Sequence, residues 1–425
     1  MNQPSDYTIS HRFFTPLNDA LQDAKSTRHC PTFSDLEFLR SGVGRVLTPV
    51  RSGREWVQRL QMTLNCSLTV NHFFASLKSD RRLRLLEEVN DSITGEIDAG
   101  IAHSKKDPLA LIPELDAYAV YASDGHFESA ATHAKPLFGK IRAVAGFYSI
   151  NLRTRSLRLL DIARPRGIKS KEHDITALKR LGSTALRLGE PKGTKVIHVY
   201  DPAIVDYWAW DRWKAKGVYI VTREKKNSAA DIQGVLEWAR DDPRNNGVVS
   251  DHLVAPGAGH LLRRVVYRDP ASGTEYTFLT NVLDVPPGVI AFLYKLRWDI
   301  EKTFDEKKNK LDEKKAWATS ETAFCQQAQF VCITYNLMTL LELELEEQED
   351  IRDDKIQRRR QKHGAEVAAL IEENKTKPNA LVAGHHRATQ RSLQFIRWLR
   401  HCIETSTSWT EGVVLLRPYM ANYIS

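Results

Sequence analysis

The sequence predicts an α/β protein in which a mixed sheet lies between helical regions at the two ends of the chain. Three observations predict it. Residues 1–112 and 346–425 carry apolar residues at helical spacing. Residues 113–225 read as three strands, then helix, strand, helix and strand. Residues 226–283 contain alternating runs typical of a β-rich insertion, after which the core resumes over 284–345.

Length and composition set the broad class. A chain of 425 residues is long enough for about two to four domains. The hydrophobic content of 42% excludes a disordered chain. The net charge of +8 favours a polyanionic partner, nucleic acid before an anionic membrane. Five scattered cysteines without a CxxC pair exclude a disulfide framework and argue against a zinc ribbon.

The sequence contains no segment typical of a signal peptide or of a membrane span. The start, MNQPSDYTIS, has no basic region followed by an apolar one, so we expect no signal peptide. The most apolar long stretch, residues 330–341, is interrupted by polar residues and is shorter than the roughly 20 residues that span a bilayer. We therefore expect a soluble, cytoplasmic protein.

The N-terminal region is predicted to be a compact helical domain. Its clearest helical segments are residues 33–47, 54–65 and 74–93, separated by short turns. The many arginines are compatible with a DNA reader of the helix-turn-helix type. A plain helical bundle that buries its own core is the equal alternative.

The α/β region is justified by short apolar runs that alternate with amphipathic stretches. In chain order we expect strands at 117–125, 141–151 and 156–164, a helix at 172–188, a strand at 194–201, a helix at 202–216 and a strand at 217–226.

The insertion and the segments after it have equally clear patterns. A short helix is expected at 232–240, followed by a hairpin at 260–283 that turns at 269–273. After Pro286 and its neighbouring proline, a long helix is expected to reach residue 311, and an apolar helix to cover 320–345.

The long helix carries the most informative side chains. Tyr294, Arg297 and Lys308 lie seven before, four before and seven after Glu301, which places all four within about 40° of one another on a helix. A separate apolar stripe would pack against the core. It consists of Val289, Leu293, Leu296, Ile300, Phe304 and Leu311. A phenol, a guanidinium, a carboxylate and an ammonium suit a phosphodiester with a divalent cation. The alternative is a solvated face with ion pairs.

The spacing Tyr294-x2-Arg297-x3-Glu301-x6-Lys308 resembles the Y-R-E-K signature of the insertion sequence 4 family of DDE transposases. All four residue types and all three gaps agree. The resemblance covers roughly residues 115–345. It implies an RNase H-like core that also needs two upstream aspartates.

The two aspartates have matches here. Asp124 ends AYAVYASD and is followed by glycine, as in the family, and Asp201 follows the strand KVIHVY. Ile204 departs from the aromatic residue that the family usually has. Asp206 is a weak rival for the second aspartate, and Asp305 is a rival for the glutamate.

The resemblance implies a two-metal site. Asp124, Asp201 and Glu301 would be the catalytic residues and the ligands of two Mg²⁺ ions, with Mn²⁺ as a substitute. The tyrosine, arginine and lysine of the signature would hold phosphates of the DNA end.

The implied function is transposition. The protein would bind double-stranded DNA at the inverted repeats of its element, cleave the ends and join the 3′ ends to target DNA, as a homodimer in the bacterial nucleoid. Residues 1–112 would bind the DNA end, and residues 346–425 are candidates for the dimer contact. A metal-dependent nuclease that never joins strands, and a non-catalytic DNA-binding remnant acting as a repressor, remain open.

Several other side chains are weaker candidates for a functional role. In some relatives an insertion tryptophan stacks on a displaced base, and Trp238 is the candidate, with packing the favoured role. His126, His133 and His198 could join a metal site, or could simply be hydrogen-bonded or exposed. The arginine-rich run 153–169 could contact phosphates or be a solvated hairpin.

Overall fold

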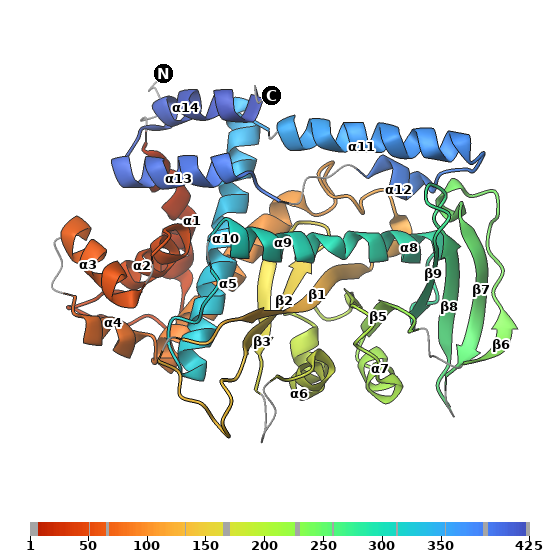
Figure 1. The fold of residues 1–425 in the computed structure, drawn as a ribbon, viewed down its shortest axis with the longest axis horizontal. Helices are drawn as coiled ribbons and strands as arrows, with labels where there is room; N and C mark the ends of the chain where they lie inside the picture. Colours follow the sequence, from red (N-terminus) through yellow and green to blue (C-terminus); the bar gives the residue numbers. More distant parts are fainter. Residues whose placement is uncertain are drawn as a thin grey trace.

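A mixed sheet crosses the molecule, with helices on both of its faces and a helical block at one side (Figure 1). The structure is a computed structural model. It describes residues 7–50, 52–64, 68–131, 133–164, 171–225, 230–256, 259–311, 313–352, 354–385 and 390–421.

The first five strands form the core of the sheet in the order β3-β2-β1-β4-β5. Strands β1, β4 and β5 run parallel, while β2 is antiparallel to both β1 and β3. This mixed arrangement fits an RNase H-like core and confirms the predicted fold class. The strands are β1 Tyr118–Glu128, β2 Val144–Asn151, β3 Leu157–Ile162, β4 Lys195–Val199 and β5 Val218–Arg223.

Four antiparallel strands from the insertion extend this sheet instead of forming a separate one. The order continues from β5 as β9-β8-β7-β6, so the whole sheet has nine strands. These strands are β6 Asp231–Val235, β7 Val248–Ala255, β8 Leu262–Arg268 and β9 Glu275–Thr280. Strands β8 and β9 confirm the predicted hairpin.

The prediction of a helix at 232–240 is wrong. Residues 231–235 form β6, which pairs with β7, and residues 236–239 are irregular. The apolar spacing there is helical, but Gly234 weakens a helix and pairing with the sheet edge supplies an alternative for the backbone.

Helices cover both faces of the sheet near its centre. Helices α6 (Asp174–Leu186) and α7 (Tyr207–Lys214) lie on one face, and α8 (Pro287–Leu296) and α9 (Trp298–Asn309) on the other (Figure 1). The helix predicted from residue 202 begins later than expected, because Asp206 caps α7.

The helices at the two ends of the chain share one apolar core. Helices α1 to α5, α13 and α14 contribute to this core together with the long helix α10 (Glu321–Glu349), and Figure 1 shows them gathered at one side of the sheet. Their bounds are α1 Ile9–Asp23, α2 Asp35–Leu47, α3 Gly53–Leu64, α4 Val70–Ser76, α5 Asp80–Ile101, α13 Leu393–Thr405 and α14 Trp409–Ala421.

Two details of this core follow from particular residues. The segment predicted as one helix over 74–93 is broken, because Ser79 caps a new helix, α5. Gly42 of α2 lies so close to the ring of Phe330 on α10 that a β-carbon there would be 2.0 Å from a ring atom. The contact between α2 and α10 therefore requires glycine.

Two further helices lie at the edge of the molecule beside the insertion: α11 (Asp354–Glu373) and the short α12 (Ala380–Gly384) (Figure 1). Within the ranges that the structure describes, no helix combines the length and the apolarity needed to cross a membrane.

Candidate active site

The two predicted aspartates lie side by side on neighbouring parallel strands. The last paired residues of β1 and β4 are Ala122 and Val199, and Asp124 and Asp201 each lie two residues further along. Asp124 is inside β1, which continues to Glu128 against β2 alone. The prediction that Asp124 ends its strand is wrong. It lies where the neighbouring strand β4 ends, and this still brings the two carboxylates together.

Backbone hydrogen bonds hold both carboxylates in place. The amide N–H of Gly125 donates to Oδ1 of Asp124 at 2.8 Å, and the amide of Ala203 donates to Oδ1 of Asp201 at 2.8 Å. The hydroxyl of Thr222 donates to the Asp201 carbonyl oxygen at 2.7 Å. Asp201 therefore heads a tight turn instead of capping α7.

A further carboxylate, which the sequence analysis did not predict, lies beside Asp124 and Asp201. Asp174, the first residue of α6, lines a narrow recess together with Asp124 and Asp201. A β-carbon on Gly125 would lie 3.0 Å from Oδ1 of Asp174, so glycine keeps this side of β1 open to that carboxylate. An aspartate in the first turn of a helix is common for electrostatic reasons, so the pattern gave no functional signal.

Burial and mutual repulsion act on these acids together. Burial, followed by the negative charges of Asp201 and Asp174, raises the pKa of Asp124 to about 7. Burial and the charge of Asp201 raise the pKa of Asp174 to about 6. No basic side chain in the described ranges forms an ion pair with Asp174 or Asp201. The recess is therefore electrostatically suited to a cation.

The signature helix is interrupted at Arg297. Its amide donates to Tyr294 O at 3.2 Å, and the amide of Ile300 donates to Arg297 O at 3.2 Å, so the chain makes tighter i→i+3 bonds there. The predicted helical span is confirmed, but as two helices, α8 and α9, that meet at Arg297.

Arg297 joins Glu301 to Asp124. Its Nη2 donates to Oε1 of Glu301, and its Nη1 lies 3.6 Å from Oδ2 of Asp124. The Arg297 side chain is 8% exposed. The structure thus brings Glu301, Arg297 and Asp124 into one cluster beside Asp201.

Tyr294 adjoins this cluster, whereas Lys308 has no contact with it among the described residues. Tyr294 is buried with its ring 5.0 Å from that of Phe278, and burial raises the pKa of its phenol, which stays protonated. Lys308 is exposed on the last turn of α9.

Buried ion pairs fix the rotation of α9, a feature that the sequence did not reveal. Lys307 bonds Glu128 of β1 and donates to the Tyr148 hydroxyl at 3.0 Å. Glu306 accepts from Arg391 Nη1 at 2.7 Å. These residues adjoin Lys308 in sequence but face inward, so helical spacing alone could not separate them from a solvated charge run.

The two rival acids have other partners. Asp206 accepts the amide N–H of Ala209 at 2.8 Å as the cap of α7. Asp305 is exposed and accepts from Asn309 and Gln390. Neither carboxylate contacts the cluster around Asp124.

The histidines near the site are structural. His198 is buried, with its ring nitrogens 2.9 Å from Ser123 Oγ and 2.7 Å from Leu186 O. The His126 ring lies tilted against that of Phe304, with ring centroids 4.8 Å apart, and burial together with the neighbouring lysines lowers the pKa of His126 to about 3. His126 is therefore neutral at physiological pH.

The remaining candidates contact other side chains of the protein. Trp238 lies in the irregular segment after β6 with Arg240 4.6 Å from its ring, not in a helix. Arg153, Arg158 and Arg164 pair with acids of the protein, as Arg153 does with Asp107 at 2.7 Å. Arg155 donates to the Tyr335 hydroxyl at 3.1 Å. Arg166 and Lys169 fall in residues 165–170, which lie outside the described residues.

The donor set has the chemistry of a magnesium or manganese site. Asp124, Asp201, Glu301 and Asp174 offer only carboxylate oxygens, which hard divalent cations prefer. Across the described ranges, no three acidic, histidine or cysteine side chains converge tightly enough to hold an ion. Glu301 is bonded to Arg297 and must turn toward the aspartates to complete a site.

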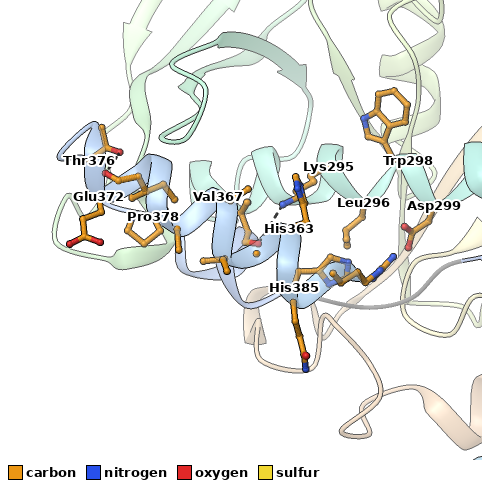
Figure 2. Close-up of a pocket in the computed structure, with 18 of the residues that line it drawn as sticks. Lys295, Leu296, Trp298, Asp299, His363, Val367, Glu372, Thr376, Pro378 and His385 are labelled. Atoms are coloured by element: carbon orange, nitrogen blue, oxygen red, sulfur yellow. Dashed lines mark hydrogen bonds between the residues drawn. The ribbon is translucent and has the colours of Figure 1, made fainter. Parts of the chain in front are cut away.

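A large cavity lies elsewhere, on another flank of the same helices. It measures about 1020 Å³ and opens between α8–α9 and α11, with Trp298 and Asp299 at one end and Thr376 and Pro378 at the other (Figure 2). Its lining contains none of the four clustered carboxylates, so size alone does not identify the site.

A comparison with known proteins matches part of the chain to one family model. Residues 151–337 match the family model described as a transposase DDE domain. This span includes Asp201 and Glu301 and begins after Asp124. The match supports a DDE transposase, a class of metal-dependent enzymes that act on DNA.

Two other comparisons add no detail. No curated protein matches the chain. A solved structure titled as a cryo-EM structure of the piggyBac transposase synaptic complex with hairpin DNA is 12% identical, with a TM-score of 0.35, covering 98% of this chain and 90% of that one. That likeness is too low to assign anything to this chain.

Proposed function

We propose that the protein is a transposase of the insertion sequence 4 type. It binds the terminal inverted repeats of its element as a dimer, cleaves the ends and joins the 3′-OH ends to target DNA. One observation carries the proposal. A single guanidinium on the helix with the Y-R-E-K spacing joins Glu301 to Asp124, directly beside Asp201.

Four carboxylates have different roles toward the metal ions that would act on the scissile phosphodiester. Asp124 and Asp201 are the fixed ligands, since backbone amides already orient them. Glu301 is the mobile ligand, and Asp174 adds negative charge at the recess. Two Mg²⁺ ions, or Mn²⁺ in their place, would supply an activated water or 3′-OH and stabilise the leaving oxygen.

The other signature residues position the DNA end. The protonated phenol of Tyr294 donates a hydrogen bond to a phosphate oxygen, because its ring is buried and only the hydroxyl can reach the substrate. Arg297 offers a planar fork to a phosphate, and exposed Lys308 adds a point charge about three turns further along.

The helical ends of the chain would handle assembly. We assign DNA-end binding to the helices of residues 1–112 and the dimer contact to those of residues 346–425. The dimer contact follows from the need to pair two DNA ends, and DNA-end binding from the many arginines of the N-terminal helices. The shared core around α10 would couple the two roles.

The test uses the DNA that flanks the gene as substrate. Purified protein is incubated with Mg²⁺, and products are mapped at nucleotide resolution, with Glu301→Gln and the neighbouring Asp305→Asn in parallel. Discrete cuts at inverted-repeat ends, joined products, loss of both in Glu301→Gln and their retention in Asp305→Asn are expected.

Other products would identify the alternatives. Cutting without joined products would indicate a metal-dependent nuclease on the same core. Binding without metal-dependent cutting would indicate a non-catalytic remnant acting as a repressor. Cutting that persists in Glu301→Gln would show that another carboxylate is the third acid.

A further inference from the structure

Arg297 occupies the place where the carboxylates of the proposed site must meet. Its Nη2 is bonded to Oε1 of Glu301, and its Nη1 is 3.6 Å from Oδ2 of Asp124. A carboxylate oxygen held by a guanidinium is not free for a cation, and a divalent ion would also be repelled by the guanidinium charge. The present arrangement therefore disfavours a metal ion shared by Glu301 and Asp124.

The same side chain has donors that the protein does not use. Nε and Nη1 of Arg297 are buried and have no hydrogen-bond partner, although the side chain is only 8% exposed. Buried guanidinium donors are normally satisfied, so these two N–H groups point to a missing acceptor. An anion that approaches the cluster from solvent would supply it.

The backbone at Arg297 allows such an exchange. The residue forms the junction of α8 and α9, where i→i+3 bonds replace the regular helical pattern. Lys307 and Glu306 anchor α9 further along, through Glu128 and Arg391. The long Arg297 side chain can therefore change partner while α9 itself stays in place.

We propose that Arg297 couples metal loading to DNA-end binding. Without DNA, it holds Glu301 and Asp124 in ion pairs that exclude the cation. A phosphate of the bound DNA end takes over the guanidinium, and the two carboxylates become free for metal. The inference rests on the proposed function and adds its regulation: the enzyme stays metal-poor until a DNA end is seated.

Thermodynamic linkage gives the inference a measurable form. If a DNA end raises the affinity for metal by some factor, metal raises the affinity for the DNA end by the same factor. Such couplings typically lie between about 5-fold and 150-fold. Removing Arg297 should abolish the coupling and, unusually for a residue of the site, strengthen metal binding in DNA-free protein.

The experiment measures Mn²⁺ affinity by calorimetry on the full-length protein without DNA. Arg297→Gln is expected to bind Mn²⁺ about 10-fold more tightly than the unmodified protein, at the lower part of that coupling range. Arg297→Lys, which keeps the charge but loses the fork, should be intermediate. Lys302→Gln removes an exposed charge from the same helix and should change the affinity less than about 2-fold.

A second arm separates the two proposals. Glu301→Gln combined with Arg297→Gln should lose the added Mn²⁺ affinity. If Glu301→Gln weakens Mn²⁺ binding but Arg297→Gln does not strengthen it, the metal site stands and the coupling is wrong. If Glu301→Gln leaves Mn²⁺ binding unchanged in both backgrounds, the proposed site itself is wrong. Circular dichroism confirms folding, and Arg297→Lys keeps the test decisive if the glutamine variant unfolds.

Discussion

Replacing Asp124 with asparagine should stabilise the protein at alkaline pH. In the folded chain the pKa of Asp124 is raised from 3.8 to about 7, first by burial and then by Asp201 and Asp174. The folded state therefore binds this proton more tightly than the unfolded state. The stability contributed by the protonated carboxyl is present below about pH 4 and is lost as pH rises through about 7.

The size of the effect follows from that shift. Three pKa units correspond to about 4 kcal/mol of unfolding free energy, at about 1.36 kcal/mol per unit. Loss of the contact with Arg297 and the partial exposure of the carboxylate reduce this. We expect Asp124→Asn to be more stable than the unmodified protein by about 2–4 kcal/mol at pH 8, and nearly equal to it at pH 4.

Chemical unfolding at a series of pH values, without divalent metal, measures this difference. Taking the variant minus the unmodified protein cancels the titration of other groups. A difference that does not change between pH 4 and 8 would refute the reasoning, since an amide that merely packs better would act at every pH.

Three further changes test other parts of the structure. Gly42→Ala should destabilise the protein by about 1–3 kcal/mol, because the added methyl group would clash with Phe330 on α10. Gly95→Ala, where α5 has open space, should stabilise it by up to about 1 kcal/mol. Equal effects of the two variants in chemical unfolding would contradict the packing. Lys307→Met should cost about 3–5 kcal/mol because it leaves Glu128 buried and unpaired, and a cost below about 1 kcal/mol would place the pair in solvent. Lys308→Gln should weaken DNA binding, measured by fluorescence anisotropy, and lower the slope against log salt by about one; an unchanged slope would remove Lys308 from the phosphate contacts.

Local patterns predicted much of the candidate site. The 3.6-residue period placed Arg297 and Glu301 together, and the structure shows them bonded. The apolar runs before Asp124 and Asp201 predicted the strands that carry them, and parallel pairing makes the two aspartates neighbours. These features depend on spacing within one element or on where one strand ends.

Features that depend on distant segments could not be predicted in the same way. Asp174 reaches the recess only because α6 packs behind the sheet, and its sequence context is that of any helix start. The pattern at 232–240 favoured a helix until β7 offered a partner for its backbone. The ion pair from Arg297 to Asp124 links residues on different elements, and no periodicity reports such a contact.

The shared core around α10 has a consequence for how the chain folds. Residues of α1 to α5 are synthesised first, yet their apolar faces are completed by α10, α13 and α14 from the last part of the chain. Closing so long a loop is entropically costly and slows folding. Until synthesis is nearly finished, the first helices expose apolar surface that chaperones or a second chain could bind. A fragment ending before α10 should therefore aggregate instead of folding as an independent module.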